Sequence, residues 1–149
     1  MPGPVYDTPL PRKSARKLAL ARRVEILENV PLFVGVPKRH LRHLAKLTRI
    51  ETFEAGQDMV TEGQPSTAAF VIVAGSAVVR RKGRKLAEVA KNDLVGELGL
   101  LTERPRNASV RTTTPVEAIA LDRNGLKAAV EEFPALGWHL IETVAERLS

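Results

Sequence analysis

The chain has 149 residues, 44% of them hydrophobic, which is enough for one folding unit with a sizeable core. It contains no cysteine, which excludes disulfides and thiolate metal sites and favours a reducing, cytoplasmic setting. The formal net charge of +6 is concentrated at the start, because residues 1–50 hold 11 Lys and Arg against 3 Asp and Glu, whereas the other 99 residues hold 12 against 14.

The first 13 residues contain four of the ten prolines. This composition resists both helix and sheet, so we predict a mobile arm over residues 1–13. The arm lacks the basic and then apolar pattern of a secretory signal, and no signal peptide is predicted.

Two helices are predicted next. Residues 14–30 form a basic amphipathic helix with Ser14 as its N-cap, and its apolar positions have helical spacing, namely Leu18, Ala21, Val24 and Leu27. A second helix begins at Pro37 and ends before Thr48. Its apolar positions are Leu41, Leu44 and Leu47.

After Ile50 the pattern changes to short β-branched runs, broken by Gly56, Gly63, Gly75, Gly83 and Pro115. This spacing predicts a small antiparallel roll or barrel. Residues 63–79 carry no charge over nearly the length of a membrane span, but Gly75 interrupts them and leaves runs of strand length, so no span is predicted.

From Arg123 the pattern returns to helix, and Pro134 divides a short helix from a longer one. The apolar positions of the longer helix are Leu136, Leu140, Val144 and Leu148. The expected fold class is therefore α+β, an antiparallel, jelly-roll-like β-roll flanked by N-terminal and C-terminal helices.

The segment GELGLLTERPRNAS, residues 96–109, lies between two strand-like runs. A single helical turn there would present the backbone N–H groups of Leu98, Gly99 and Leu100 to an anion, and Gly96 and Gly99 would let a ligand approach closely. Arg106 lies in the segment that leads from this turn back to the next strand, here called the return limb, and could pair with a phosphate through two parallel hydrogen bonds. Glu97 suits a sugar hydroxyl, so the implied ligand is a cyclic mononucleotide.

With these residues the sequence resembles the cyclic nucleotide-binding domain family, over about residues 28–148. The resemblance rests on PLF at 31–33, FEAGQDMVTEG at 53–63, AFVIVAGSAVV at 69–79 and above all GELGLLTERPRNAS. We therefore assign residues 31–149 to such a domain.

The resemblance implies that Glu97 accepts a hydrogen bond from the ribose 2′-hydroxyl and that Arg106 pairs with the cyclic phosphate. It implies mainly backbone contacts to the ligand from Gly96, Leu98, Gly99, Asn107 and Ala108. The ligand is cAMP or cGMP, and no cofactor or metal is expected.

The sequence departs from the family pattern at several places. Asn92 stands where the family usually has glycine, and since asparagine tolerates a left-handed backbone we expect the turn to persist. Leu94 and Val95 stand where an aromatic residue is common. Asn107 occupies a position where Ala is typical of cAMP sites and Thr of cGMP sites, so either base is open. The last helix stops before the residues that cap the base in the bacterial catabolite activator, a member of this family.

No output domain follows within the chain, so the resemblance implies signalling in trans through movement of the terminal helices. Trp138, the N-terminal helix or a partner chain could supply the missing lid over the base, although core or interface packing is the default role of Trp138. We expect an unidentified protein partner, rank it above nucleic acid because the chain has few aromatic residues, and leave a homodimer open.

His40 and His43 lie three residues apart on a helix, but no third ligand has matching spacing, so we interpret them as exposed histidines. Nucleophile, P-loop and dinucleotide motifs are missing, and an enzyme is not expected. The alternative to a sensor is a ligand-free scaffold of the same fold, which would dock an acidic partner through the basic N-terminal helix.

Overall fold

A computed structural model describes residues 18–65, 68–96, 98–102 and 104–147 of the chain. The predicted arm over residues 1–13 and the predicted cap Ser14 lie outside the described residues, as do Glu97 and Leu148.

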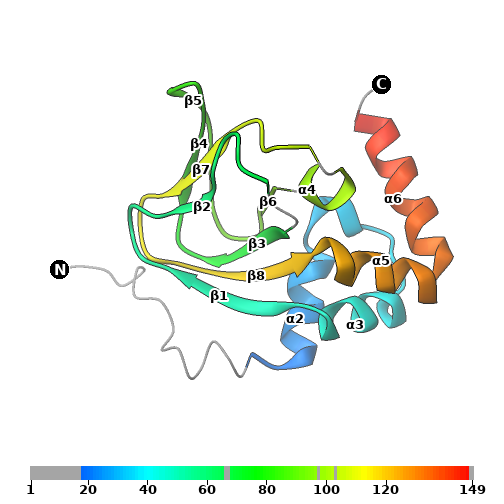
Figure 1. Ribbon diagram of the computed structural model, residues 1–149. Helices are drawn as coiled ribbons and strands as arrows, with labels where there is room; N and C mark the ends of the chain where they lie inside the picture. The colour runs from blue at the N-terminus through cyan, green and yellow to red at the C-terminus, as the bar shows by residue number, and fades with distance from the viewer. Residues whose placement is uncertain (1–17, 66–67, 97, 103, 148–149) are drawn as a thin grey trace.

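Two four-stranded antiparallel sheets face each other and form the β-roll (Figure 1). The first sheet has the order β1 (Arg49–Phe53), β8 (Val116–Asp122), β3 (Ala68–Ala74) and β6 (Leu94–Val95). The second has the order β2 (Asp58–Val60), β7 (Ser109–Thr112), β4 (Ala77–Arg81) and β5 (Arg84–Val89). The predicted α+β roll with flanking helices is confirmed.

The helices gather at one end of the roll (Figure 1). Those before the strands are α2 (Leu20–Glu28), the 3-10 turn η2 (Pro31–Phe33) and α3 (Lys38–Lys46). Those after them are α5 (Arg123–Glu132) and α6 (Pro134–Arg147), which divide at Pro134 as predicted. The short turn α4 (Leu98–Leu101) projects from the roll toward this helical layer.

The strand β8 separates two hydrophobic cores because its side chains alternate between its faces. Ala118 and Ala120 belong to the core inside the roll, together with Phe70 of the neighbouring strand. Ile119 and Leu121 belong to the core between the sheet and the helices. The core between the sheet and the helices therefore packs on the outer face of β3 and β8, whose inner faces form part of the core inside the roll.

The first helix differs from its prediction at its start. In the described residues α2 begins at Leu20, after Ala19, which provides no side-chain cap. Val24 and Leu27 are buried as expected, but Ala21 is exposed and Ile26 is buried in its place. The second helix matches most of its prediction, because α3 follows Pro37 and buries Leu41 and Leu44. The predicted apolar position Leu47 is wrong, since this residue follows the end of α3 and is 39% exposed.

The expectation that the helix histidines are exposed is wrong for His40. Its side chain is buried, and its ring stacks on Phe133 with centroids 4.2 Å apart. His43 meets the edge of the same ring at 5.4 Å. The sequence pattern of α3 could not show this, because the covering residue lies at the junction of α5 and α6.

Of the two default roles of Trp138, core packing is wrong, whereas interface packing stays a prediction. Trp138 lies on α6 and is 68% exposed, next to Ile141 at 58%. The helix packs inward through Leu136 and Leu140 instead. The uncharged stretch 63–79 contributes β3 and the first residues of β4. In the described part of the chain no helix has the length and apolar character needed to cross a membrane.

Candidate ligand-binding site

The glycine-rich segment forms the single helical turn that was predicted. Gly96 follows β6 with a φ of +79°, a left-handed conformation that favours glycine, and α4 begins two residues later. The first backbone N–H groups of any helix have no partner within the helix, so those at the start of this turn are able to bind an anion. Glu97, at that start, lies outside the described residues.

The backbone of Arg106 is held by the loop after β2. Its N–H donates to the carbonyl oxygen of Gln64 at 3.1 Å, and its carbonyl oxygen accepts from the N–H of Gly63 at 2.8 Å. Gly63 has a φ of +82°, which explains the glycine at the end of the motif FEAGQDMVTEG. These two hydrogen bonds hold the segment of Arg106, between α4 and β7, against the loop after β2.

The side chain of Arg106 turns into the protein and is only 7% exposed. Its Nη1 donates to the carbonyl oxygen of Gly96 at 2.6 Å, and its Nη2 donates to the carbonyl oxygen of Ala68. A Cβ atom at Gly96 would lie 3.1 Å from Nη1. We expected Gly96 to give room to a ligand, and in this structure it gives room to the guanidinium.

Burial lowers the pKa of Arg106 from its ordinary value, because a desolvated guanidinium loses its hydration. Arginine nevertheless stays charged in proteins. The site therefore contains a fixed positive charge beside the turn α4.

A cavity of about 420 Å³ lies inside the roll beside Arg106. This volume falls in the range of about 300 to 1,000 Å³ that is typical of small-molecule sites. Its wall is mostly apolar, formed by Val60, Val79, Val89, Leu94, Val95, Pro105, Ala108 and Val110. Its other lining residues are Gly96, Thr102, Arg104, Arg106 and Asn107. The cavity can thus hold a molecule with a flat apolar part and an anionic part.

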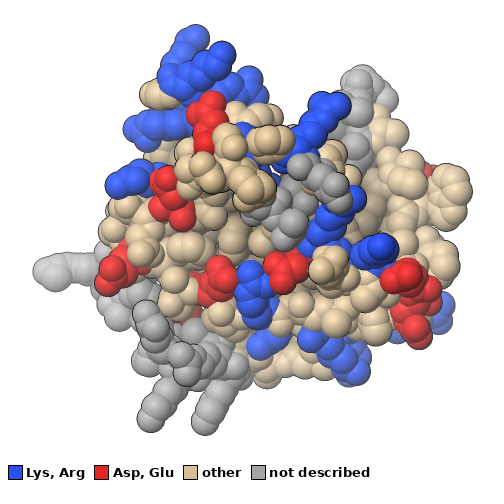
Figure 2. Space-filling view, in the orientation of Figure 1, with Lys and Arg blue, Asp and Glu red and all other residues tan. Residues whose placement is uncertain are grey.

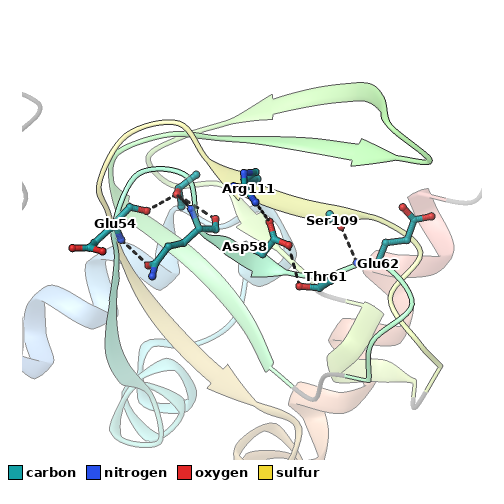
Figure 3. A network of polar contacts seen from close by, with 8 residues as sticks. Glu54, Asp58, Thr61, Glu62, Ser109 and Arg111 are labelled. Atoms are coloured by element: carbon teal, nitrogen blue, oxygen red, sulfur yellow. Dashed lines mark hydrogen bonds and ion pairs between the residues drawn. The ribbon is translucent and has the colours of Figure 1, made fainter.

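A polar network fastens β2 to β7 behind this wall (Figure 3). Arg111 pairs with Asp58 at 3.2 Å, and the N–H of Glu62 donates to the hydroxyl of Ser109 at 2.8 Å. The hydroxyl of the buried Thr112 donates to the carbonyl oxygen of Glu54 at 2.6 Å. These contacts hold β7, which follows the segment of Arg106, against β2, which leads into the loop of Gly63 and Gln64.

The structure brings together four of the residues predicted from the sequence, since Gly96, Arg106, Asn107 and Ala108 all line the cavity. Leu100 does not, because its side chain is buried in the core on the helical side. Leu98 and Gly99 contribute to α4, while Trp138 is not among the cavity-lining residues.

Apart from Ala108, the residues of the apolar wall were not predicted. Pro105 and Ala108 lie between α4 and β7, and the other members come from β2, β4, β5, β6 and β7, so only the closed roll brings them to one place. The alternation of apolar residues along each strand could have indicated which side chains face inward. It could not have indicated which of them lie at the end beside Arg106.

The turn before β6 confirms the expectation for Asn92. This residue has a φ of +75°, and its N–H donates to the carbonyl oxygen of Ile72 at 2.8 Å. Asparagine is one of the few residues other than glycine that adopts this conformation readily. The strand β6 and the cavity residues Leu94 and Val95 therefore keep their position without the usual glycine.

The chain is similar to several known proteins. A CRP-like cAMP-activated global transcriptional regulator of Mycobacterium tuberculosis is 30% identical over 129 residues, 83% of this chain and 58% of that protein. A cAMP-dependent protein kinase regulatory subunit of Emericella nidulans is 33% identical over 103 residues, 68% of this chain and 25% of that protein. The chain thus spans between about a quarter and somewhat over half of the length of these relatives.

Among solved structures, the N-terminal domain of a transcriptional regulator from Streptomyces coelicolor is similar with a TM-score of 0.75 and 29% identity. The match covers 83% of this chain and 89% of that one. Residues 50–133, more than half of the chain, match the profile of the family described as the cyclic nucleotide-binding domain. This chain therefore belongs to the cyclic nucleotide-binding domain family.

Proposed function

We propose that the protein is a regulatory module that binds cAMP or cGMP. The observation that carries this proposal is the buried guanidinium of Arg106 in the wall of a cavity of about 420 Å³ that is otherwise mostly apolar. A singly charged cyclic phosphate meets the positive charge there, and the base and ribose enter the apolar part. Two of the similar proteins are a cAMP-activated regulator and a regulatory subunit of a cAMP-dependent kinase, which supports the same ligand class.

Each site residue then has a distinct role. Arg106 forms a charge-assisted pair with the phosphate, and the first N–H groups of α4 donate to the same oxygens. Glu97 accepts a hydrogen bond from the ribose 2′-hydroxyl. The cavity-lining Asn107 and Ala108 contribute mainly backbone, and the valines of the wall cover the apolar face of the ligand. Asn107 leaves the choice between adenine and guanine open.

The regulatory step is a movement of the last helix. The chain changes direction at Phe133, which ends α5 with a φ of −130° and a ψ of 83°. A hinge at Phe133 and Pro134 would let α6 swing and bring Trp138 over the base. A ligand shifts such an equilibrium only by its differential affinity for the two states, typically about 1 to 3 kcal/mol.

The output of this movement is a changed affinity for a partner protein, and the module has no catalytic step of its own. By linkage, the partner changes nucleotide affinity by the same factor. We also propose that the sensor works in a reducing compartment such as the cytoplasm, which a chain without cysteine supports.

Thermal unfolding tests the proposal with matched nucleotides. A ligand at about 100 times its Kd stabilises the folded state by about 2.7 kcal/mol, which raises the melting temperature of a chain of this size by roughly 5 to 10 °C. We expect this rise with cAMP or cGMP and a much smaller one with 5′-AMP, which keeps the base and ribose but has an open phosphate. No rise with either cyclic nucleotide, or an equal rise with 5′-AMP, would contradict the proposal.

A further inference from the structure

The strongest concentration of charge in the described residues lies on the hairpin of β4 and β5, residues 77–89, here called the basic hairpin. Its six positions 80–85 hold five cationic side chains, Arg80, Arg81, Lys82, Arg84 and Lys85, and all five residues are exposed. Figure 2 shows Lys and Arg gathered over this hairpin at the top of the molecule. Residues 51–149 together have a net negative charge, so their summed charge does not reveal the basic hairpin.

The pairing of the two strands places like charges opposite each other. Arg80 is paired with Lys85, and Arg81 with Arg84. Like charges directly across an antiparallel pair are destabilising. Among the described residues only Lys85 of the five forms a salt bridge through its side chain, with Glu88. This arrangement of like charges therefore does not stabilise the fold.

The hairpin is nevertheless held in a defined shape. Its two turn residues, Lys82 and Gly83, have φ values of +50° and +81°, as in the tight turns that match the twist of paired strands. The N–H of Lys82 donates to the carboxylate of Glu62 at 3.0 Å, and Nε of Arg81 donates to the carbonyl oxygen of Asn107 at 3.2 Å. The cations are thus presented on a fixed scaffold.

The strand β5 is also an edge strand. It pairs with β4 and with no other strand of the described residues, so its outer edge presents unpaired backbone groups. Leu86, in the middle of the strand, is 54% exposed. An exposed edge is the geometry that accepts an added strand, in which backbone hydrogen bonds supply affinity and the alternate side chains supply specificity.

We propose that the basic hairpin docks an extended acidic segment of a partner protein, which pairs with β5 as an additional strand. Acidic side chains of the segment neutralise the opposed cations, and an apolar side chain covers Leu86. A nucleic acid fits less well, because its phosphates use neither the strand edge nor Leu86, and residues 77–89 contain no aromatic side chain for stacking on bases. Docking at the basic hairpin does not depend on whether the cavity binds a nucleotide.

The test uses the full chain and a fluorescein-labelled peptide of alternating Glu and Val, about ten residues long so that it spans β5. The decisive variant is Arg80→Glu/Arg84→Glu, which turns both like-charge pairs into opposite-charge pairs. The matched control is Arg42→Glu/Lys46→Glu, which makes the same change of charge at exposed positions of α3. A peptide with Lys in place of Glu and a DNA duplex serve as comparison ligands.

We expect salt-sensitive binding of the acidic peptide by the parent and by the α3 control. The hairpin variant should bind at least about tenfold more weakly, while its melting temperature equals or exceeds that of the parent, because its cross-strand pairs are now attractive. Amide hydrogen exchange should slow in residues 84–89 when the peptide binds. Failure of the parent to bind, equal losses in both variants, tighter binding of the duplex, or no protection of β5 would each overturn the proposal.

Discussion

The guanidinium of Arg106 and the backbone of Gly96 occupy adjacent space, with Nη1 donating to the Gly96 carbonyl oxygen at 2.6 Å and a Cβ at Gly96 reaching 3.1 Å from the same atom. The left-handed turn at Gly96 and the orientation of Arg106 therefore depend on each other. Two residues ten positions apart thus form one structural unit at the cavity wall.

Replacement of Gly96 by Ala should disturb this unit. A left-handed backbone costs a non-glycine residue about 1 to 2 kcal/mol, and the new methyl group would also crowd the guanidinium. We expect a lower melting temperature and weakened cyclic-nucleotide binding. Gly83→Ala is the matched control, because Gly83 has nearly the same φ, +81°, but no atom within 4 Å of the added Cβ. If Gly83→Ala weakened nucleotide binding as much as Gly96→Ala, crowding of Arg106 would not be the cause.

The hydroxyl of Thr112 should contribute to stability. It donates to the carbonyl oxygen of Glu54 and accepts from the N–H of Gln57 at 2.9 Å, at a position that is 2% exposed. Thr112→Val leaves both backbone groups without this partner, so the free energy of unfolding should fall by about 1 to 3 kcal/mol. Thr113→Val, at an exposed neighbour, should change it by less than about 0.5 kcal/mol. Urea unfolding of both variants checks this, and equal losses would refute it.

His40 should make stability depend on pH. Desolvation by burial, followed by the nearby charge of Arg39, lowers the pKa of His40 from its ordinary value of 6.5. Below about pH 6.5 the unfolded chain binds a proton at His40 more readily than the folded chain does. The free energy of unfolding is therefore greatest above this pH and falls as the pH decreases. His40→Phe keeps a ring against Phe133 and removes the titration.

We therefore expect the melting temperature of the parent to fall between about pH 7.5 and pH 5.5 more steeply than that of His40→Phe. Scanning calorimetry across this range measures both slopes. Parallel curves for the two proteins would show that His40 does not carry the dependence.

Trp138 should report closure of the lid. It is the only tryptophan and is 68% exposed in this structure, so its emission is that of a solvated indole. If α6 brings it over the base, saturating cyclic nucleotide should shift the emission to shorter wavelength, whereas 5′-AMP should not. An unchanged spectrum, in a protein whose melting temperature rises with the nucleotide, would place the lid elsewhere.

The sequence predicted the roll and the Arg106 limb well because both depend on local features. Strand alternation and turn glycines mark the roll, and Gly96, Asn92 and Arg106 occupy positions whose backbone requirements are visible in a short segment. Most of the apolar wall was not predictable in the same way, since its strand residues meet only when five strands close into the roll.

The remaining errors concern contacts between distant segments. His40 is buried because Phe133, from the junction of α5 and α6, stacks on it. Trp138 is exposed because α6 turns Leu136 and Leu140 toward the core instead. The basic hairpin was missed because its charge was averaged with that of the acidic residues around it, although the opposed cations are adjacent in space.

The most direct measurement is a calorimetric titration of the parent and of Arg106→Ala with cAMP and, separately, with cGMP, alongside Arg42→Ala as an exposed control. A charge-assisted hydrogen bond contributes roughly 1.5 to 3 kcal/mol, so we predict saturable binding of one nucleotide or both by the parent and the control, and at least about tenfold weaker binding by Arg106→Ala. No heat with either nucleotide, or equal affinities for the parent and Arg106→Ala, would contradict the assignment of Arg106 to a cyclic-nucleotide site.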